Sequence, residues 1–293
     1  MFCDMDKKEH FHRLNKYFEK SKLGYNLLLG GSKHFGFYPK EKDITEKEAQ
    51  IFLQELVGDK LNLSSSNIVL DAGCGQGVVS TFLARKYDCH IEGITMLPFE
   101  VDEANILARK LNINKNVNYS LMDYNEMTFQ DDFFDAVYTT ESLSHSTDIR
   151  ATLKEFYRVL KDEGRIALFE YTIAEDGQFT ASELKIINKV ALGSAMDALR
   201  DFRHDEFQKI LEEAGFGNIK IENISENTAP SLGRLRKFLI IPYYLFVKPF
   251  GLQERFPNAS AGVEFYKMAK KGLIRYNIFT ASKSREIPQK QSR

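Results

Sequence analysis

The stretch from Ile68 to Gly77, IVLDAGCGQG, joins a short apolar run to three glycines, and an apolar helical pattern follows it. This order is typical of a buried strand that turns into a helix in a parallel sheet. The first such turn lies at the carboxyl edge of the strands, where ligands bind beside the point at which the strand order reverses. Glycines let the backbone approach a ligand without a Cβ in the way, and free amides at the helix start favour an anion. The stretch therefore predicts a cofactor site rather than a tight turn alone.

The spacing of the glycines decides which cofactor this loop can hold. The dinucleotide fingerprint GxGxxG requires a glycine where the chain has Val78, and no GxxxxGK phosphate loop occurs in the sequence. The observed pattern, D-x-G-x-G-x-G, resembles motif I of the class I S-adenosylmethionine-dependent methyltransferases. The resemblance implies that S-adenosyl-L-methionine is the cofactor. The motif residues that would bind it are Asp71, Gly73, Cys74, Gly75 and Gly77.

Further segments resemble the same family in chain order. The second predicted strand ends at Thr95, about 20 residues past the glycine loop, where an acidic residue usually holds the ribose hydroxyls. Threonine at this position is shared by the subfamily that contains sterol side-chain and tocopherol methyltransferases and the cyclopropane-fatty-acid synthases. The resemblance assigns Thr95 and Met96 to the cofactor and places Asp123 and Tyr124 beside its adenine.

Motifs outside the cofactor fold also resemble this subfamily. The segment HFGFY, from His34 to Tyr38, is similar to one in tocopherol-type enzymes, whereas ESLSH, from Glu141 to His145, and FEY around Glu170 resemble segments of sterol methyltransferases. The N-terminal aromatic motif of the sterol enzymes is replaced by YNLLLGG, and the chain has no tryptophan. The resemblance implies that the N-terminal segment covers the cofactor. The residues predicted to contact the acceptor are Tyr25, His34, Tyr38 and Glu170.

Methyl transfer from a sulfonium is an in-line displacement, so the protein must mainly align the two partners and exclude water. Good orientation alone supplies about 7 to 11 kcal/mol. A catalytic side chain is needed for the proton that leaves the acceptor, or to stabilise a carbocation when the acceptor is an alkene. Glu141 and His145 follow the fourth predicted strand and are our catalytic candidates. The structural alternatives are a carboxylate favoured at a helix N-terminus for Glu141 and a hydrogen-bonded cap for His145.

These motifs require alternating strands and helices, and the chain provides them from residue 67 onward. Short apolar runs alternate with helical patterns, which predicts an α/β fold with a Rossmann-like, doubly wound, mostly parallel sheet of seven strands. An N-terminal helical lid, with helices at 8–20 and 45–61 around a loop at 24–39, precedes this core. The predicted units are the lid at 1–62, the core at 63–225, a helical cap insertion at 226–273, the final strand at 274–281 and a disordered tail at 282–293.

The composition restricts the partners of the protein. The chain has 293 residues with 40 Lys and Arg against 41 Asp and Glu, so it lacks the basic excess of a nucleic-acid-binding protein. Its three cysteines lack paired spacing and no signal-peptide pattern is visible, which predicts a cytoplasmic protein without a metal site. The most apolar window, at 238–250, is too short to span a bilayer.

Half of the 36 aromatic rings lie in two segments, with eight in residues 1–40 and ten in residues 225–280. These segments are the predicted lid and cap, so the rings predict an apolar acceptor chamber, with plain cap packing as the alternative. Residues 234–250 also combine rings with basic side chains, which is compatible with a weak peripheral contact with a membrane surface or with a substrate cap. Pro242 favours the cap because it interrupts an amphipathic helix.

We therefore predict an S-adenosylmethionine-dependent methyltransferase for a small, largely hydrophobic acceptor, namely a terpenoid, sterol-like, quinol-like or polycyclic natural product. The segment from Glu141 to His145 favours C-methylation. The alternative is N- or O-methylation of a small natural product or amine. A non-catalytic cofactor-binding scaffold is the alternative of a different class, and a nicotinamide oxidoreductase is more distant because of Val78. The sequence leaves the oligomeric state open.

Overall fold

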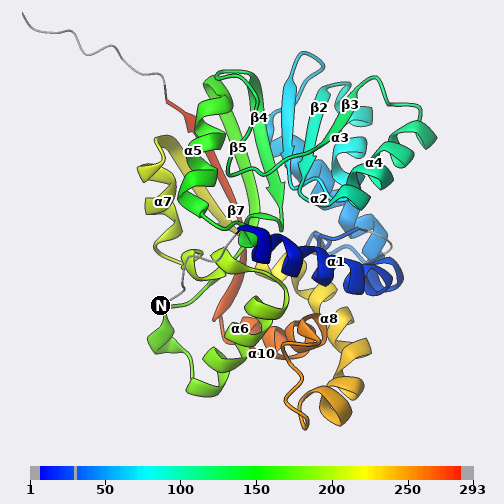
Figure 1. Ribbon diagram of the computed structural model, residues 1–293, viewed down its shortest axis with the longest axis vertical. Helices are drawn as coiled ribbons and strands as arrows, with labels where there is room; N and C mark the ends of the chain where they lie inside the picture. Colours follow the sequence, from blue (N-terminus) through cyan, green and yellow to red (C-terminus); the bar gives the residue numbers. More distant parts are fainter. Residues whose placement is uncertain (1–6, 30–31, 285–293) are drawn as a thin grey trace, which may run out of the picture.

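The computed structural model describes residues 7–29 and 32–284, without the side chains of residues 23 and 25–28, and its centre is a seven-stranded sheet between helices (Figure 1). The strands are β1 (Ile68–Ala72), β2 (His90–Thr95), β3 (Val117–Leu121), β4 (Phe134–Thr140), β5 (Leu160–Ile173), β6 (Phe216–Asn223) and β7 (Ile274–Lys283). The core helices are α2 (Glu46–Leu61), α3 (Val78–Tyr87), α4 (Pro98–Lys110), α5 (Ile149–Val159) and α7 (Phe207–Glu213).

The strand order is β3-β2-β1-β4-β5-β7-β6, with β7 antiparallel to both of its neighbours. The other pairs are parallel, and Val69 of β1 faces Ala136 of β4. The order therefore reverses between β1 and β4, so the loops after these two strands open onto the same crevice. This topology confirms the predicted Rossmann-like, mostly parallel sheet of seven strands.

Each face of the sheet buries the apolar side of a different set of helices. On one face Leu53 of α2 and Leu83 of α3 pack on the strands, and on the other face Leu153 of α5 and Phe207 of α7 do so. All four side chains are fully buried, and burying one side chain of this kind contributes about 1.5 to 3 kcal/mol. Because helices cover both faces of the sheet, the central strands are buried on both sides, and their sequences are therefore continuous apolar runs.

The remaining helices cover the carboxyl edge of the sheet. In Figure 1, α1 (Lys7–Leu29, dark blue) crosses this edge, and α6 (Ala181–Gly193), α8 (Ser225–Pro242) and α10 (Tyr266–Lys270) lie beyond it. Between α8 and α10 the chain forms two π-helical turns, η4 (Tyr243–Val247) and η5 (Ala261–Phe265), with the short helix α9 (Pro257–Ser260) before η5. The helical block predicted between the last two strands is therefore present.

Two predicted boundaries differ from the structure. The loop predicted over 24–39 begins later, because α1 continues to Leu29. Glycine inside a helix costs only about 1 kcal/mol, and burial of Leu29 offsets this cost at Gly24. The tail predicted from residue 282 also begins later, because Ser282 pairs with Arg165 of β5 and β7 ends at Lys283. Residues 285–293 of the predicted tail lie outside the described residues.

Candidate functional site

A cavity of about 310 Å³ lies between the carboxyl edge of the sheet and the helices that cover it. We call the loops after β1, β2 and β4 its floor, and α1, α6, α8, α9 and η5 its roof. The floor contributes glycine-loop and polar residues, among them Gly75, Thr95, Glu141 and His145. The roof contributes a mostly apolar surface, formed by Leu14, Phe18, Val190, Leu235, Leu239 and Phe265.

The three glycines of the loop after β1 all have left-handed backbones, with φ of 90° at Gly73, 52° at Gly75 and 75° at Gly77. A Cβ on Gly73 would lie 2.5 Å from the Cβ of Ser142, and one on Gly77 would lie 2.6 Å from the hydroxyl of Tyr119. A Cβ on Gly75 would approach only the Lys33 side chain, at 3.8 Å, and Gly75 lines the cavity. The bare backbone at Gly75 is the cradle that a closely bound cofactor requires, so the loop fits S-adenosylmethionine.

A polar cluster stands at the end of β2, beside the glycine loop. The hydroxyl of Thr95 donates to Oε2 of Glu100 at 2.5 Å, and Oε1 of Glu100 pairs with the ammonium of Lys33. All three residues line the cavity, and Glu100 is almost fully buried in the first turn of α4. Glu100 and Lys33 were not among the predicted site residues. The sequence did contain a signal for Glu100, because this acidic residue lies five positions after Thr95. Members of the family usually carry the acidic residue at the position of Thr95, about one helical turn earlier.

Most of the predicted cofactor residues line the cavity, namely Gly73, Cys74, Gly75, Thr95, Met96 and Tyr124, whereas Asp71, Gly77 and Asp123 do not. Asp71 is buried within β1 beneath the glycine loop, where burial raises its pKa to about 7. Asp123 accepts bonds from the backbone and side-chain amides of Asn125, both at 2.8 Å. These two carboxyls therefore shape the walls, and Met122, which was not predicted, lines the cavity beside Tyr124.

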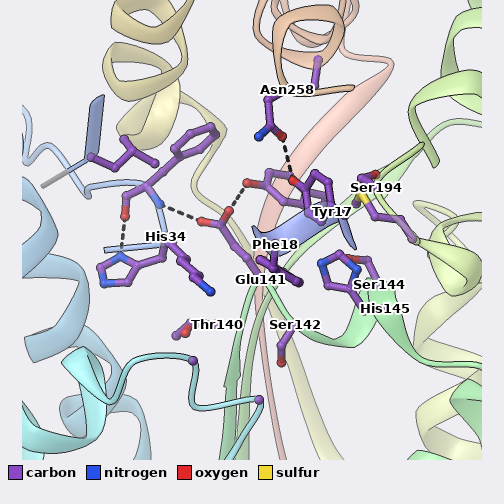
Figure 2. Close-up of a pocket in the computed structure, with 18 of the residues that line it drawn as sticks. Tyr17, Phe18, His34, Thr140, Glu141, Ser142, Ser144, His145, Ser194 and Asn258 are labelled. Atoms are coloured by element: carbon purple, nitrogen blue, oxygen red, sulfur yellow. Dashed lines mark hydrogen bonds between the residues drawn. The ribbon is translucent and has the colours of Figure 1, made fainter. Parts of the chain in front are cut away.

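Glu141, directly after β4, lines the cavity and has a left-handed backbone with φ 56°. Such a backbone costs a residue with a side chain about 1 to 2 kcal/mol, and it occurs mostly where surrounding structure holds it in place. The carboxylate accepts bonds from the backbone N–H of Phe35 at 2.8 Å, from the Tyr276 hydroxyl at 3.0 Å and from the Tyr171 hydroxyl. Figure 2 shows Glu141 among the residues that line the cavity. Burial raises the pKa of Glu141 to about 7.

Glu170 does not line the cavity, although the sequence analysis placed it at the acceptor. Its Oε1 accepts bonds from the Thr139 hydroxyl at 2.9 Å and from the backbone N–H groups of Ser142 and Leu143, each at 3.0 Å. Burial raises the pKa of Glu170 to about 8. Glu170 is thus the carboxylate that accepts bonds from the N–H groups at the start of the short 3₁₀ turn after β4. Glu141 was proposed as an alternative to have such a role, but its own donors are Phe35, Tyr171 and Tyr276.

His145 lines the cavity at the end of the same turn (Figure 2). Its Nδ1 lies 3.1 Å from the carbonyl oxygen of Ala195, which assigns the ring hydrogen to Nδ1, and its ring meets that of Phe18 edge-on. Burial lowers the pKa of His145 to about 4. The imidazole is therefore neutral at physiological pH, and Glu141 is the stronger base of the two candidates.

The other predicted acceptor residues differ in position. His34 lines the cavity, but its Nδ1 donates to the Phe35 carbonyl at 2.8 Å and its Nε2 faces the Gln54 side-chain amide at 3.2 Å, so both ring nitrogens are occupied. Tyr38 lies outside the cavity, where its hydroxyl donates to Glu46 at 2.9 Å. Tyr25 belongs to α1, but its side chain lies outside the described residues.

Hydrogen bonds and ion pairs hold α1 over the floor. The Tyr17 hydroxyl donates to Oδ1 of Asn258 in α9 at 2.7 Å (Figure 2). Arg13 and His10 both contact Asp197, which follows α6, at 2.6 Å. These contacts join segments that are more than 180 residues apart in the chain. The N-terminal segment is thus attached to the cap across the cavity.

The aromatic rings of the cap are distributed differently from the expectation. Of the ten rings in residues 225–280, only Phe265 lines the cavity, and all ten lie within the described residues. Five rings are instead exposed, namely Phe238, Tyr244, Phe246, Phe250 and Phe256. Leucines of α8 face the cavity in their place. The rings of α1 agree better with the expected aromatic chamber, since Tyr17 and Phe18 both line the cavity.

Sheet topology, glycine loop and cavity define a protein that binds a small cofactor at the switch point of an α/β sheet. The family described as Methyltransferase domain matches residues 63–215, just over half of the chain. The chain therefore belongs to the S-adenosylmethionine-dependent methyltransferase family, and S-adenosyl-L-methionine is its cofactor.

Relatives extend this assignment beyond the core. The chain is 30% identical over 269 residues to the S-adenosyl-L-methionine-dependent Diels-Alderase iccD of Talaromyces variabilis, covering 86% of this chain and 89% of that protein. It is 26% identical over 230 residues to sterol 24-C-methyltransferase ERG6 of Saccharomyces cerevisiae, covering 76% of this chain but only 59% of that protein. The crystal structure of the [4+2]-cyclase SpnF shares the fold, with a TM-score of 0.76 and 23% identity over 94% of this chain and 97% of that one.

Proposed function

We propose that the protein transfers the methyl group of S-adenosylmethionine to a small, uncharged and largely apolar acceptor, such as a terpenoid, sterol-like, quinol-like or polycyclic natural product. The observation that carries this proposal is one cavity with a polar floor and an apolar roof. Among the described residues that line the cavity, Lys33 is the one Lys or Arg, and its ammonium pairs with Glu100. This pairing leaves no charge for an anionic acceptor and favours a neutral one.

The floor supplies the groups that would hold the cofactor. Bound S-adenosylmethionine supplies an electrophilic methyl group. The bare backbone at Gly75 would let the cofactor lie against the loop, and Met96, Met122 and Tyr124 form an apolar wall for a flat ring. Glu100 stands beside Thr95 and would accept bonds from ribose hydroxyls, a task for which a threonine alone lacks the charge.

The rest of the chemistry falls to residues near the end of β4. A carboxylate with its pKa near 7 is partly ionised at neutral pH and is suited to take a proton from an acceptor. Glu141 accepts three hydrogen bonds, while a carboxylate has about four acceptor positions, so one remains for the acceptor. The same carboxylate would stabilise a cation formed at carbon, so this site serves C-methylation as well as the N- or O-methylation alternative.

A second candidate function is a cyclisation in which the cofactor is bound but not consumed. It is favoured by the relative named a Diels-Alderase, which this chain matches over almost its whole length. An enclosed apolar cavity accelerates a unimolecular cyclisation by holding its substrate in a folded conformation, without any base. The apolar roof supports this function as well as methyl transfer.

Product analysis with a labelled cofactor distinguishes the possibilities. The protein is incubated with methyl-labelled S-adenosylmethionine and panels of terpenoids, sterols, quinols, polyenes and amines, and the products are measured by mass spectrometry. Methyl transfer gives a labelled product together with an equal amount of S-adenosylhomocysteine. Cyclisation gives an unlabelled isomer of the substrate and no S-adenosylhomocysteine. Cofactor binding without either product across lipid and natural-product extracts would instead support the non-catalytic scaffold.

A further inference from the structure

The exposed apolar side chains of this protein are concentrated in one short segment. Of the twelve large apolar side chains that are exposed in the described residues, seven lie between residues 238 and 256. We call these seven the outer patch: Phe238, Ile241, Tyr244, Leu245, Phe246, Phe250 and Phe256. Phe250 is 71% exposed and Ile241 67%. A cluster of this kind marks an interaction site, whereas single exposed apolar residues do not.

Two residues of the outer patch belong to the same helix as three residues that line the cavity. Leu232, Leu235 and Leu239 of α8 line the cavity, whereas Phe238 and Ile241 of α8 are exposed. The inner side packs closely on η5, because a Cβ on Gly262 would lie 2.9 Å from the Leu239 side chain. Only the width of this helix, about 10 Å with its side chains, therefore separates Phe238 and Ile241 from the cavity.

Basic side chains accompany the outer patch. Residues 234–256 contain five Lys and Arg against one acidic residue, Glu254, although the whole chain is almost neutral. Lys237, Lys248 and Arg255 are exposed within two positions of patch residues in the sequence, and Lys248 lies 3.9 Å from the carboxylate of Glu264. The ammonium of Lys248 also lies 5.0 Å from the centre of the Tyr244 ring. Rings and aliphatic side chains with cations between them suit the boundary between lipid headgroups and acyl chains.

We propose that the outer patch docks the protein on an anionic lipid surface. The turns after α8 carry most of the patch, and this segment lies at the lower end of the molecule in Figure 1, away from the core helices. The positive charge is complementary to anionic headgroups, while the rings and Ile241 reach the acyl boundary. Within the described part of the chain, no helix is long and apolar enough to cross a membrane.

Docking would bring the cavity within one helix of the lipid phase. If the proposed function holds, a hydrophobic acceptor would then pass from the membrane to the roof of the cavity without crossing much water. This second step rests on the proposed function, whereas docking itself does not. Docking is therefore tested by vesicle binding, which needs no acceptor.

The experiment measures flotation of the protein with phosphatidylcholine vesicles, with and without phosphatidylglycerol. The wild type is expected to float with the mixed vesicles and to be released by high salt, because exposed charges are screened. Phe246→Ser combined with Phe250→Ser is expected to lower the partition coefficient at least about tenfold. The matched control replaces two exposed isoleucines elsewhere, Ile106→Ser with Ile221→Ser, and is expected to bind as the wild type does.

Three results would overturn the proposal. The wild type could fail to bind the mixed vesicles, the patch variant could bind them equally well, or the patch could instead hold a second copy of the chain. In the last case sedimentation would show a dimer that Phe246→Ser with Phe250→Ser converts to a monomer, without vesicle binding. Affinity for S-adenosylhomocysteine, measured in the absence of lipid, should be equal in all variants. A failed docking experiment would therefore leave the proposed function untouched, and an inactive protein could still dock.

Discussion

At the floor of the cavity, Gly73, Gly75 and Gly77 take left-handed backbones within five consecutive residues. At the roof, α1 is held by Asn258 and Asp197, residues more than 180 positions away. The floor is thus formed by local turns on a buried sheet, whereas the roof depends on a few side-chain contacts between segments that are distant in the chain. The floor is rigid and suited to a constant cofactor, while the roof can vary with the acceptor.

The largest expected effect comes from a substitution in the floor and concerns the affinity for the cofactor. Gly75→Val should weaken S-adenosylhomocysteine binding at least about 100-fold, because a side chain would occupy the cradle where the cofactor lies. Isothermal titration calorimetry measures this affinity. Gly251→Val is the control, since Gly251 also has a positive φ, of 68°, and no atom within 4 Å of the added Cβ. Unchanged affinity in the Gly75 variant would refute the assignment of the cofactor to this loop.

The next effect lies where floor and roof meet, at Glu141. Glu141→Gln should lower turnover at least about tenfold with little change in cofactor affinity, because the amide cannot accept the proton. Since burial raises the pKa of Glu141 to about 7, the wild-type rate should rise with pH through 7. Rate profiles of both proteins across this range test the assignment. Equal turnover in the variant would remove Glu141 from the mechanism.

The same pKa shift has a consequence for stability that needs no acceptor. Between its ordinary pKa of 4.5 and about 7, the folded protein retains a proton on Glu141 that the unfolded chain releases. The contribution to stability is therefore present at low pH and is lost as the pH rises through this window. Thermal unfolding should show a fall in Tm over this range that is smaller in Glu141→Gln. An identical fall in both proteins would contradict the raised pKa.

The smallest effect is expected from a substitution that weakens the attachment of α1 in the roof. Tyr17→Phe removes the hydroxyl that donates to Asn258 and retains the ring, so amide exchange in α1 should accelerate about fivefold, the equivalent of one net hydrogen bond. The KM for an acceptor should rise by a similar factor, with cofactor affinity unchanged. Hydrogen-exchange mass spectrometry measures the first change. Loss of cofactor affinity instead would mean that the roof also forms the cofactor site.

The predictability of the site follows this division between floor and roof. The glycine loop, Thr95 and Tyr124 line the cavity, and each belongs to a local motif at or just after the end of a strand that the family resemblance made visible. The partners of Glu100 and Glu170 could not be predicted, since Lys33 and the turn at Ser142 are distant from them in sequence.

The cap shows the same limit. Its excess of rings was visible in the sequence, but which side of α8 faces the cavity depends on packing against η5. The seven strands and their order of appearance were predicted, whereas the continuation of α1 through Gly24 was not, because tertiary burial outweighed the glycine penalty.

The position of β7 also determines when the site can form during synthesis. This strand is the last of the seven in chain order, yet it inserts between β5 and β6 and carries Tyr276, which donates to Glu141. Until it emerges from the ribosome, β5 presents an open edge and Glu141 lacks one of its donors. The nascent chain can therefore complete its glycine loop early, but the surroundings of Glu141 only after β7 has been translated.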